Sequence, residues 1–60
     1  MVRKITDAQR RALSRLALRF NVNYRKLRRD AAPAFDGTGC IMVYLAGMWF
    51  GIEADGYTHT

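Results

Sequence analysis

The residues of this chain best suited to bind a ligand are the basic ones, and all ten lie within residues 1–30. Two acidic residues accompany them, so the first half of the chain carries a formal charge of +8. Residues 31–60 contain no Lys or Arg and three acidic residues, which gives a charge of −3. Such segregation is typical of a face directed at an anion, commonly a nucleic acid. The total of +5 is by itself ordinary for a small domain.

Two groups of cations within the basic half have the spacing of a contact surface. In the first group, three arginines recur one helical turn apart, where like charges repel by roughly a few tenths of a kcal/mol per pair. Phosphate contact would offset this repulsion, and the alternative is a solvated helix face. The second group is a run of four cations interrupted by one leucine. The predicted nucleic-acid-binding residues are Arg11, Arg15, Arg19, Arg25, Lys26, Arg28 and Arg29.

A tryptophan in the second half offers a different kind of contact. An exposed Trp on a sheet can stack on a base or fill a pocket of a partner protein. Trp49 could instead stabilise the sheet beside Val43 or Tyr44, or pack between the sheets of a homodimer. Because large apolar surfaces are seldom left bare, we expect Trp49 to be covered by one of these partners. Trp49 and Tyr44 are the predicted partner-binding residues.

The remaining polar residues show no pattern of catalysis or metal binding. The single cysteine, Cys40, excludes an intrachain disulfide, and the single histidine, His59, has no cluster of metal ligands around it in the sequence. We expect Cys40 to be a small core residue, His59 to lie at the surface or a sheet edge, and Asp36, Glu53 and Asp55 to lie at turns or on a solvent face. Without a triad, a carboxylate pair or a phosphate loop, we expect a protein that is not an enzyme and has no cofactor.

A small structure must position these residues, since residues 1–60 make one domain. Domains of this size have a marginal core and often gain stability from a partner subunit or ligand. A lone cysteine fits a reducing compartment, and no apolar stretch follows the basic residues 1–6, as a secretory signal would require. The uncharged run 37–52 contains three glycines and is shorter than the roughly 20 residues of a membrane helix. We therefore expect no membrane contact and a cytoplasmic location.

The first element is predicted to be an amphipathic helix over residues 7–20. Thr6 and Gln9 have the spacing of a capping box, and Asn21 is suited to a left-handed cap. The apolar face repeats at helical spacing. It consists of Ala12, Leu13, Leu16, Ala17 and Phe20. Leu18 points into the basic side, so we expect it to pack under a later segment, against Leu27 or Phe35, or else to anchor a partner.

The second half is predicted to form a three-stranded antiparallel meander. Residues 40–45 and 48–53 are rich in β-branched and aromatic residues, and Asp55-Gly56 favours a tight turn into a last strand over 57–60. The first hairpin has two registers, because a two-residue loop pairs Leu45 with Met48 and a three-residue loop pairs Tyr44 with Met48. In both registers Met48, Phe50 and Ile52 share the face that lies under the helix. Trp49 then lies on the opposite face.

The middle of the chain, residues 22–36, has two interpretations. It is either a short second helix, capped by Asn23 and stopped by Pro33, or an edge strand beginning at Val22 and Tyr24 with a loop after it. With either interpretation the fold class is α+β, with the N-terminal amphipathic helix packed on the small β-meander.

Residues 16–29 resemble the core of a helix-turn-helix. The match rests on Leu-Ala at the end of the first helix, on apolar turn positions and on a buried leucine in the second helix. These residues are Leu16, Ala17, Phe20, Val22 and Leu27. The resemblance implies that residues 24–29 form a recognition helix in the major groove, whose four cations contact phosphates or base edges, with the following hairpin as a wing. Asn21 and Asn23 replace the usual glycine and serine, and the third helix of that family is missing.

A broader resemblance is to small uncharacterised proteins of actinobacterial phages and prophages. It rests on Thr-x-Ala-Gln near the start, Phe-x-Val-x-Tyr-Arg in the middle, Pro33-Ala-Phe-Asp36 and the Gly-rich apolar hairpin. The resemblance implies expression in the cytoplasm of a bacterial host cell. It also implies a middle segment of strand and loop, and binding to a host protein or nucleic acid.

The sequence therefore predicts a non-catalytic module that binds nucleic acid or acts as a regulator. The alternative is a small inhibitor or adaptor that binds a host protein through the exposed face of the sheet. A homodimer with packed sheets is the third hypothesis.

Overall fold

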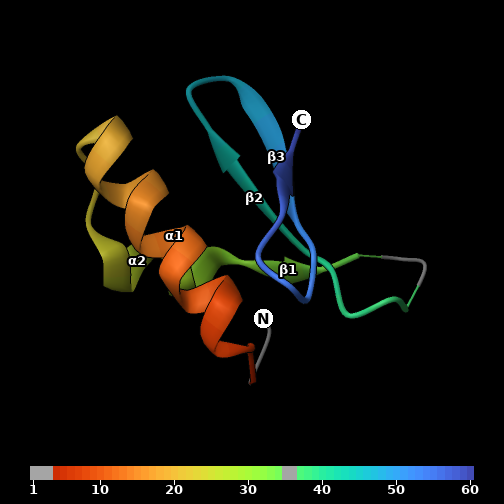
Figure 1. Ribbon diagram of the computed structural model, residues 1–60. Coiled ribbons are helices and arrows are strands. Elements are labelled where there is room, and N and C mark those ends of the chain that lie inside the picture. Colours follow the sequence, from red (N-terminus) through yellow and green to blue (C-terminus); the bar gives the residue numbers. More distant parts are fainter. Residues whose placement is uncertain (1–3, 35–36) are drawn as a thin grey trace.

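The computed structural model describes residues 4–34 and 37–60 as two helices followed by a four-stranded antiparallel sheet (Figure 1). The helices are α1 (Asp7–Phe20) and α2 (Tyr24–Asp30). The strands are β1 (Ala32–Pro33), β2 (Ile41–Leu45), β3 (Met48–Ile52) and β4 (Thr58–His59), and they lie in the order β1-β2-β3-β4. The predicted α+β class, with an N-terminal helix and a β-meander, is confirmed. Within the described residues, no helix has the length and apolar character needed to cross a membrane.

Helix α1 begins and ends where its capping residues predict. The Thr6 hydroxyl accepts a hydrogen bond from the Gln9 amide at 3.0 Å, and the Gln9 side-chain oxygen accepts from the Thr6 amide at 3.0 Å. The backbone amides of Thr6 and Gln9 would otherwise be unpaired donors at the start of the helix. After Phe20, Asn21 adopts left-handed backbone angles with φ of 54°, which turns the chain away from the helix axis.

Helix α2 decides between the two interpretations of the middle segment. The Asn23 side chain accepts from the Lys26 amide at 3.1 Å, and Leu27 is buried. The short second helix is confirmed, and the edge strand at Val22 and Tyr24 is wrong. The cap and one buried leucine are enough to stabilise this two-turn helix because it packs against α1. Pro33 does not stop the helix, since Ala31 is already extended.

Strand β1 was not predicted, so the meander has one strand more than expected. Ala32 pairs with Met42 and Pro33 with Ile41. Two residues are too few for alternation to be visible in a sequence. The strand lies at the sheet edge, where proline is tolerated because its missing N–H is not needed.

The hairpin between β2 and β3 has the shorter of the two predicted loops. Leu45 pairs with Met48 across Ala46-Gly47, whose φ angles are 51° and 79°. Both angles are positive, as a two-residue turn that matches the strand twist requires. Ala46 therefore adopts the left-handed backbone region, which is strained for a residue with a Cβ. This register places Tyr44 opposite Trp49.

The core lies between α1, α2 and one face of the sheet. Leu13 and Leu16 of α1 pack with Val43, Phe50 and Ile52. Met48 shares that face but is half-exposed, because it directly follows the hairpin turn at the end of the sheet. The remaining buried hydrophobic members of the cluster are Ala12, Ala17, Leu27, Ala31, Ile41 and Leu45.

Leu18 does not pack as predicted. Its side chain is 82% exposed, so the expected contact with Leu27 is wrong, and Phe35 lies outside the described residues. The physical reason is angular: Leu18 lies on the opposite side of α1 from Leu13 and Leu16. Val22 and Tyr24 border the same shallow groove as Leu18 but leave its side chain exposed. The alternative role as a partner anchor stays a prediction.

Candidate functional site

The predicted nucleic-acid-binding residues lie on the surface of α1 and α2. Six of the seven are exposed and Arg28 is half-buried. In the described residues, two arginines form ion pairs with carboxylates, Arg10 with Asp7 at 3.2 Å and Arg29 with Asp30 at 3.7 Å. All four side chains are well exposed. Such pairs contribute little to stability, so the guanidinium groups of Arg10 and Arg29 remain accessible to an external anion.

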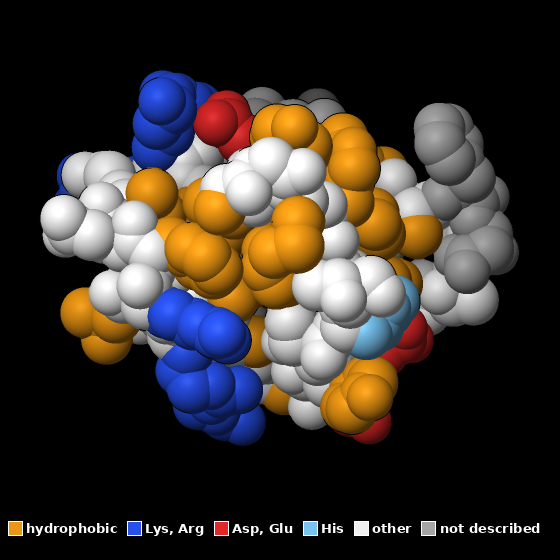
Figure 2. All heavy atoms as spheres, turned by 90° about the horizontal axis from the view of Figure 1, so that it is seen from above, with side chains coloured by type: hydrophobic (Ala, Val, Ile, Leu, Met, Phe, Trp, Pro, Cys, Tyr) orange, Lys and Arg blue, Asp and Glu red, His pale blue; other side chains and the backbone are white. Residues whose placement is uncertain are grey.

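Arg15 and Arg19 border a groove between α1 and the β3–β4 edge of the sheet. The groove encloses about 580 Å³, and its lining includes the apolar side chains of Leu16, Phe20 and Phe50. The Arg19 guanidinium lies 5.5 Å from the centre of the Phe20 ring, within the range of a cation–π contact. Figure 2 shows hydrophobic side chains gathered at this end of the molecule, with Lys and Arg side chains at their border.

Arg11 lies on a different groove from Arg15 and Arg19. Together with Arg10, Ser14 and Tyr24 it lines a shallower depression of about 380 Å³ where α1 meets α2. The three arginines predicted as one stripe therefore follow the exposed side of α1 but border two separate grooves. The stripe rotates around the helix because four residues advance slightly more than one turn.

On α2, three of the four cations point in two directions, and the fourth, Arg28, is half-buried. Arg25 and Arg29 lie opposite the buried Leu27 at helical spacing, so they face away from the protein. Lys26 instead borders a groove of about 330 Å³ that is also lined by Tyr44 and Trp49 of the sheet. One residue of the predicted nucleic-acid-binding set is thus brought next to the predicted partner-binding residues.

Tyr44 and Trp49 are both exposed and in contact with each other. Their side chains are 59% and 56% exposed, and the ring centres lie 5.2 Å apart at an interplanar angle of 60°. The cross-strand contact is therefore present, as one alternative predicted. The expectation that Trp49 is covered is wrong for the single chain, because the helices pack on the opposite face of the sheet.

A buried glutamine joins α1 to the sheet, and the sequence interpretation missed this role. The Gln9 side-chain nitrogen donates to the carbonyls of Gly39 at 2.8 Å and Ile52 at 3.1 Å, and Gln9 is only 2% exposed. The Thr6 hydroxyl also donates to the Ala54 carbonyl at 2.6 Å. The available signal was a Gln at helical spacing with Ala12, Leu13 and Leu16, which placed it on the buried face.

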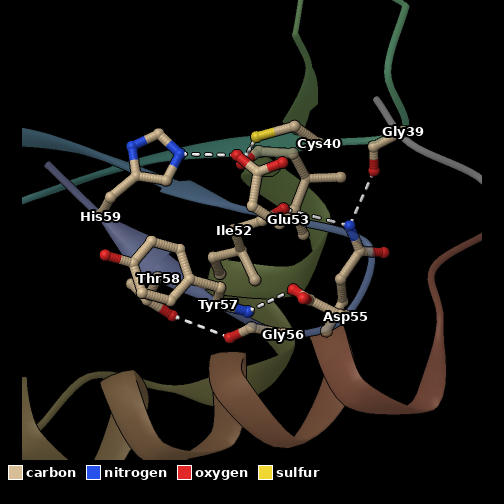
Figure 3. A network of polar contacts seen from close by, with 11 residues as sticks. Gly39, Cys40, Ile52, Glu53, Asp55, Gly56, Tyr57, Thr58 and His59 are labelled. Carbon is tan, nitrogen blue, oxygen red and sulfur yellow. Dashed lines mark hydrogen bonds and ion pairs between the residues drawn. The ribbon is translucent and has the colours of Figure 1, made fainter.

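Near these bonds, three residues with metal-binding side chains lie together (Figure 3). They are Cys40 before β2, Glu53 after β3 and His59 in β4. One ligand atom from each lies within 4.8 Å of the other two, and His59 Nε2 is 2.8 Å from Glu53 Oε2. Cys40 is buried and His59 exposed, as predicted, but no pattern in the sequence indicates that they meet. Their spacing matches no motif because antiparallel pairing, rather than local sequence, brings them together.

No family model, curated protein or solved structure matches this chain.

Proposed function

We propose that the protein is a non-catalytic module that binds nucleic acid through the exposed cations of α1 and α2. The observation that carries the proposal is α2, a capped helix with Arg25 and Arg29 directed outward on a half-chain of charge +8. The described sheet residues include no Lys or Arg, so the field of the molecule has a direction. A phosphate backbone is the anion that such a field attracts most strongly.

The arrangement of the two helices supports this proposal. Asn21, Val22 and Asn23 separate α1 from α2, a short connection of the kind that joins the helices of a helix-turn-helix. Leu16 and Leu27, two of the residues that carry the resemblance, are buried in the common core. The sheet covers the apolar side of both helices, which is the task of the third helix in that family.

Binding would rest on phosphate contacts from two surfaces. Arg25 and Arg29 face outward from α2, and Arg15 and Arg19 border the groove beside β3 and β4. Each phosphate contact with duplex DNA releases condensed counterions. The logarithm of the binding constant therefore falls linearly with the logarithm of the salt concentration, with a slope of about 0.9 per phosphate neutralised. Trp49, beside Lys26, could add base stacking if the ligand is single-stranded.

The test is fluorescence anisotropy with labelled duplex DNA and single-stranded RNA across a salt series. The double variant Arg25→Ala/Arg29→Ala should lower the salt slope by about 2, because about one counterion is released per lost phosphate contact. The charge-matched control Lys4→Ala/Arg10→Ala removes the same two charges near the start of α1. It should change the slope less.

Three results bear on the proposal. Steep salt dependence that flattens only in the α2 variant supports it. Equal effects in both variants would mean that net charge, rather than α2, drives binding. Absence of binding at low salt to either nucleic acid would refute it.

Exposure of Tyr44 and Trp49 favours a second candidate, a protein-binding adaptor. Two aromatic side chains, each more than half exposed and in mutual contact, form the kind of anchor that dominates protein interfaces. Trp49→Ala should then abolish capture of a specific partner from bacterial lysate, whereas Arg25→Ala/Arg29→Ala should leave it unchanged. If two copies of the chain pair through this face instead, sedimentation at micromolar concentration gives a dimer that Trp49→Ala converts to a monomer.

A further inference from the structure

We propose that Cys40, Glu53 and His59 form a binding site for a transition-metal ion, with Zn²⁺ as the best-fitting ion. The three residues supply a thiolate, a carboxylate and an imidazole, which are the three side-chain ligands that zinc uses in proteins. One ligand atom from each lies within 4.8 Å of the other two. The site is independent of the basic surface and of the function proposed for it.

The distances fit a metal ion between the three groups after a small adjustment. Zinc bonds of about 2.0–2.3 Å in tetrahedral geometry place neighbouring ligand atoms about 3.3–3.6 Å apart. The contact of 2.8 Å between His59 Nε2 and Glu53 Oε2 would open slightly, and the Cys40 sulfur already lies within 4.8 Å of the ligand atoms of both residues. His59 and Glu53 are partly exposed, so their side chains can shift and a water molecule can complete the coordination.

The backbone that carries the first two ligands is held by α1. Gln9 donates to the carbonyls of Gly39 and Ile52, the residues immediately before Cys40 and Glu53. Thr6 donates to the carbonyl of Ala54, immediately after Glu53. Figure 3 shows the Gly39 and Ile52 carbonyls joined by dashed lines to one side-chain nitrogen, close to Cys40 and Glu53. A preformed backbone lowers the entropy that metal binding would otherwise cost.

The third ligand is positioned by the return of the chain through β4. The Glu53 amide donates to the Tyr57 carbonyl at 2.8 Å, which closes the turn and brings His59 back beside β3. The His59 ring lies directly over Gly51, where an added Cβ would be 2.6 Å from the ring. The Tyr57 ring stacks on the His59 ring, with ring centres 6.1 Å apart. A glycine below and an aromatic ring beside the imidazole restrict it to the side facing Glu53.

The ligand set selects among metals. Thiolate and imidazole favour zinc and similar transition metals, whereas Mg²⁺ and Ca²⁺ prefer oxygen ligands. Bound zinc would link the start of β2, the end of β3 and β4. Such a cross-link would stabilise a 60-residue domain whose single cysteine cannot form an intrachain disulfide.

The experiment uses the full chain, reduced and freed of metal with a chelator. Titration with Co²⁺ should produce a sulfur-to-cobalt charge-transfer absorption that saturates at one ion per chain, and added Zn²⁺ should abolish it. Zn²⁺ should also raise the Tm, whereas Mg²⁺ should not. Cys40→Ser should remove the absorption. His59→Gln and Glu53→Gln should each weaken metal binding by more than about tenfold, because even the loss of an outer-shell partner typically costs about that much.

Two control variants and two outcomes make the test decisive. Asp30→Asn removes a carboxylate on α2, away from the site, and should leave metal affinity unchanged. Gly51→Ala should displace His59 and weaken binding while circular dichroism still reports a folded chain. Absence of the charge-transfer band in the wild-type protein would refute the proposal. So would saturation at one ion per two chains, or wild-type affinity in His59→Gln.

Discussion

The helical half of the molecule (residues 4–31) and the sheet half (residues 32–60, apart from 35–36) differ in their charged side chains and in their polar side-chain contacts. Every described Lys and Arg lies in the helical half, and the ion pairs of Arg10 with Asp7 and of Arg29 with Asp30 are exposed. In the sheet half, polar contacts gather at one end, around Cys40, Glu53 and His59. Charge is therefore concentrated where the fold depends on it least. Ordered polar contacts are concentrated where strands must be brought into register.

Gln9 is the residue at which the two halves meet. It belongs to α1, yet its side chain is bonded to the backbone before Cys40 and the backbone before Glu53. The helical half thus contributes two things that are separable by mutation. One is a buried surface that organises the sheet, and the other is an exposed set of cations that is available for a ligand.

The largest expected effect separates the two faces of α1. Leu13 is fully buried, so Leu13→Ala should lower the free energy of unfolding by about 2–5 kcal/mol, through lost burial and a residual cavity. Leu18→Ala, the same substitution at an exposed position on the same helix, should change it by less than about 0.5 kcal/mol. Urea denaturation followed by circular dichroism measures both. Similar losses in the two variants would mean that the exposed side of α1 is covered.

The second test removes the connection between the halves. Gln9→Ala leaves the buried Ile52 carbonyl without this donor, which costs about 1–3 kcal/mol, and it also removes the part-buried bond to the Gly39 carbonyl. We expect a loss of about 2–3 kcal/mol in unfolding free energy. The neighbouring control Arg10→Ala should stay within about 0.5 kcal/mol, because its ion pair is exposed. A Gln9 variant as stable as the control would contradict the buried bridge.

The third test concerns the exposed face of the sheet. A double-mutant cycle with Tyr44→Ala and Trp49→Ala should give a coupling energy of about 0.5–1 kcal/mol, as expected for an aromatic cross-strand pair. The control cycle pairs Trp49→Ala with Leu18→Ala, which lies on the exposed side of α1, and should give coupling below about 0.5 kcal/mol. Thermal or urea unfolding provides the four stabilities of each cycle. Coupling that vanishes for Tyr44 and Trp49 would leave both rings without a structural role.

The smallest effect concerns charges at the helix ends. Asp7 lies in the first turn of α1 and pairs with Arg10. Asp7→Asn should therefore lower stability by about 0.5 kcal/mol at low salt, and by less at high salt. Asp30 is the last residue of α2, where a negative charge opposes the helix dipole. Asp30→Asn should leave stability unchanged or slightly raise it, and the opposite order of the two variants would exclude the dipole as the cause.

Local patterns in the sequence determined most of the elements. The bounds of α1 follow from Thr6, Gln9 and Asn21, and these caps act over distances of a few residues. The shared face of Met48, Phe50 and Ile52 follows from strand alternation in any register. The segregation of charge between the halves is likewise a property of the sequence itself. Each of these depends only on neighbours along the chain.

Tertiary structure alone decided the rest. Two registers were open for the hairpin because both turns are locally allowed, and the choice that pairs Tyr44 with Trp49 depends on how the whole sheet packs. β1 was not visible because two residues hold no periodicity, and its partner strand begins only at Ile41. Leu18 was expected to be covered, but the segment that follows α1 leaves its side chain 82% exposed.

The cluster of Cys40, Glu53 and His59 shows the same limit most clearly. These residues carry no recognisable spacing in the sequence, and each has an ordinary structural explanation when considered alone. They meet because β2, β3 and β4 pair antiparallel and Gln9 holds the ends of two of these strands. The sequence by itself determined which side chains are present and which helix carries the positive charge. Only long-range pairing decided which side chains meet, because such contacts depend on the packing of the complete chain.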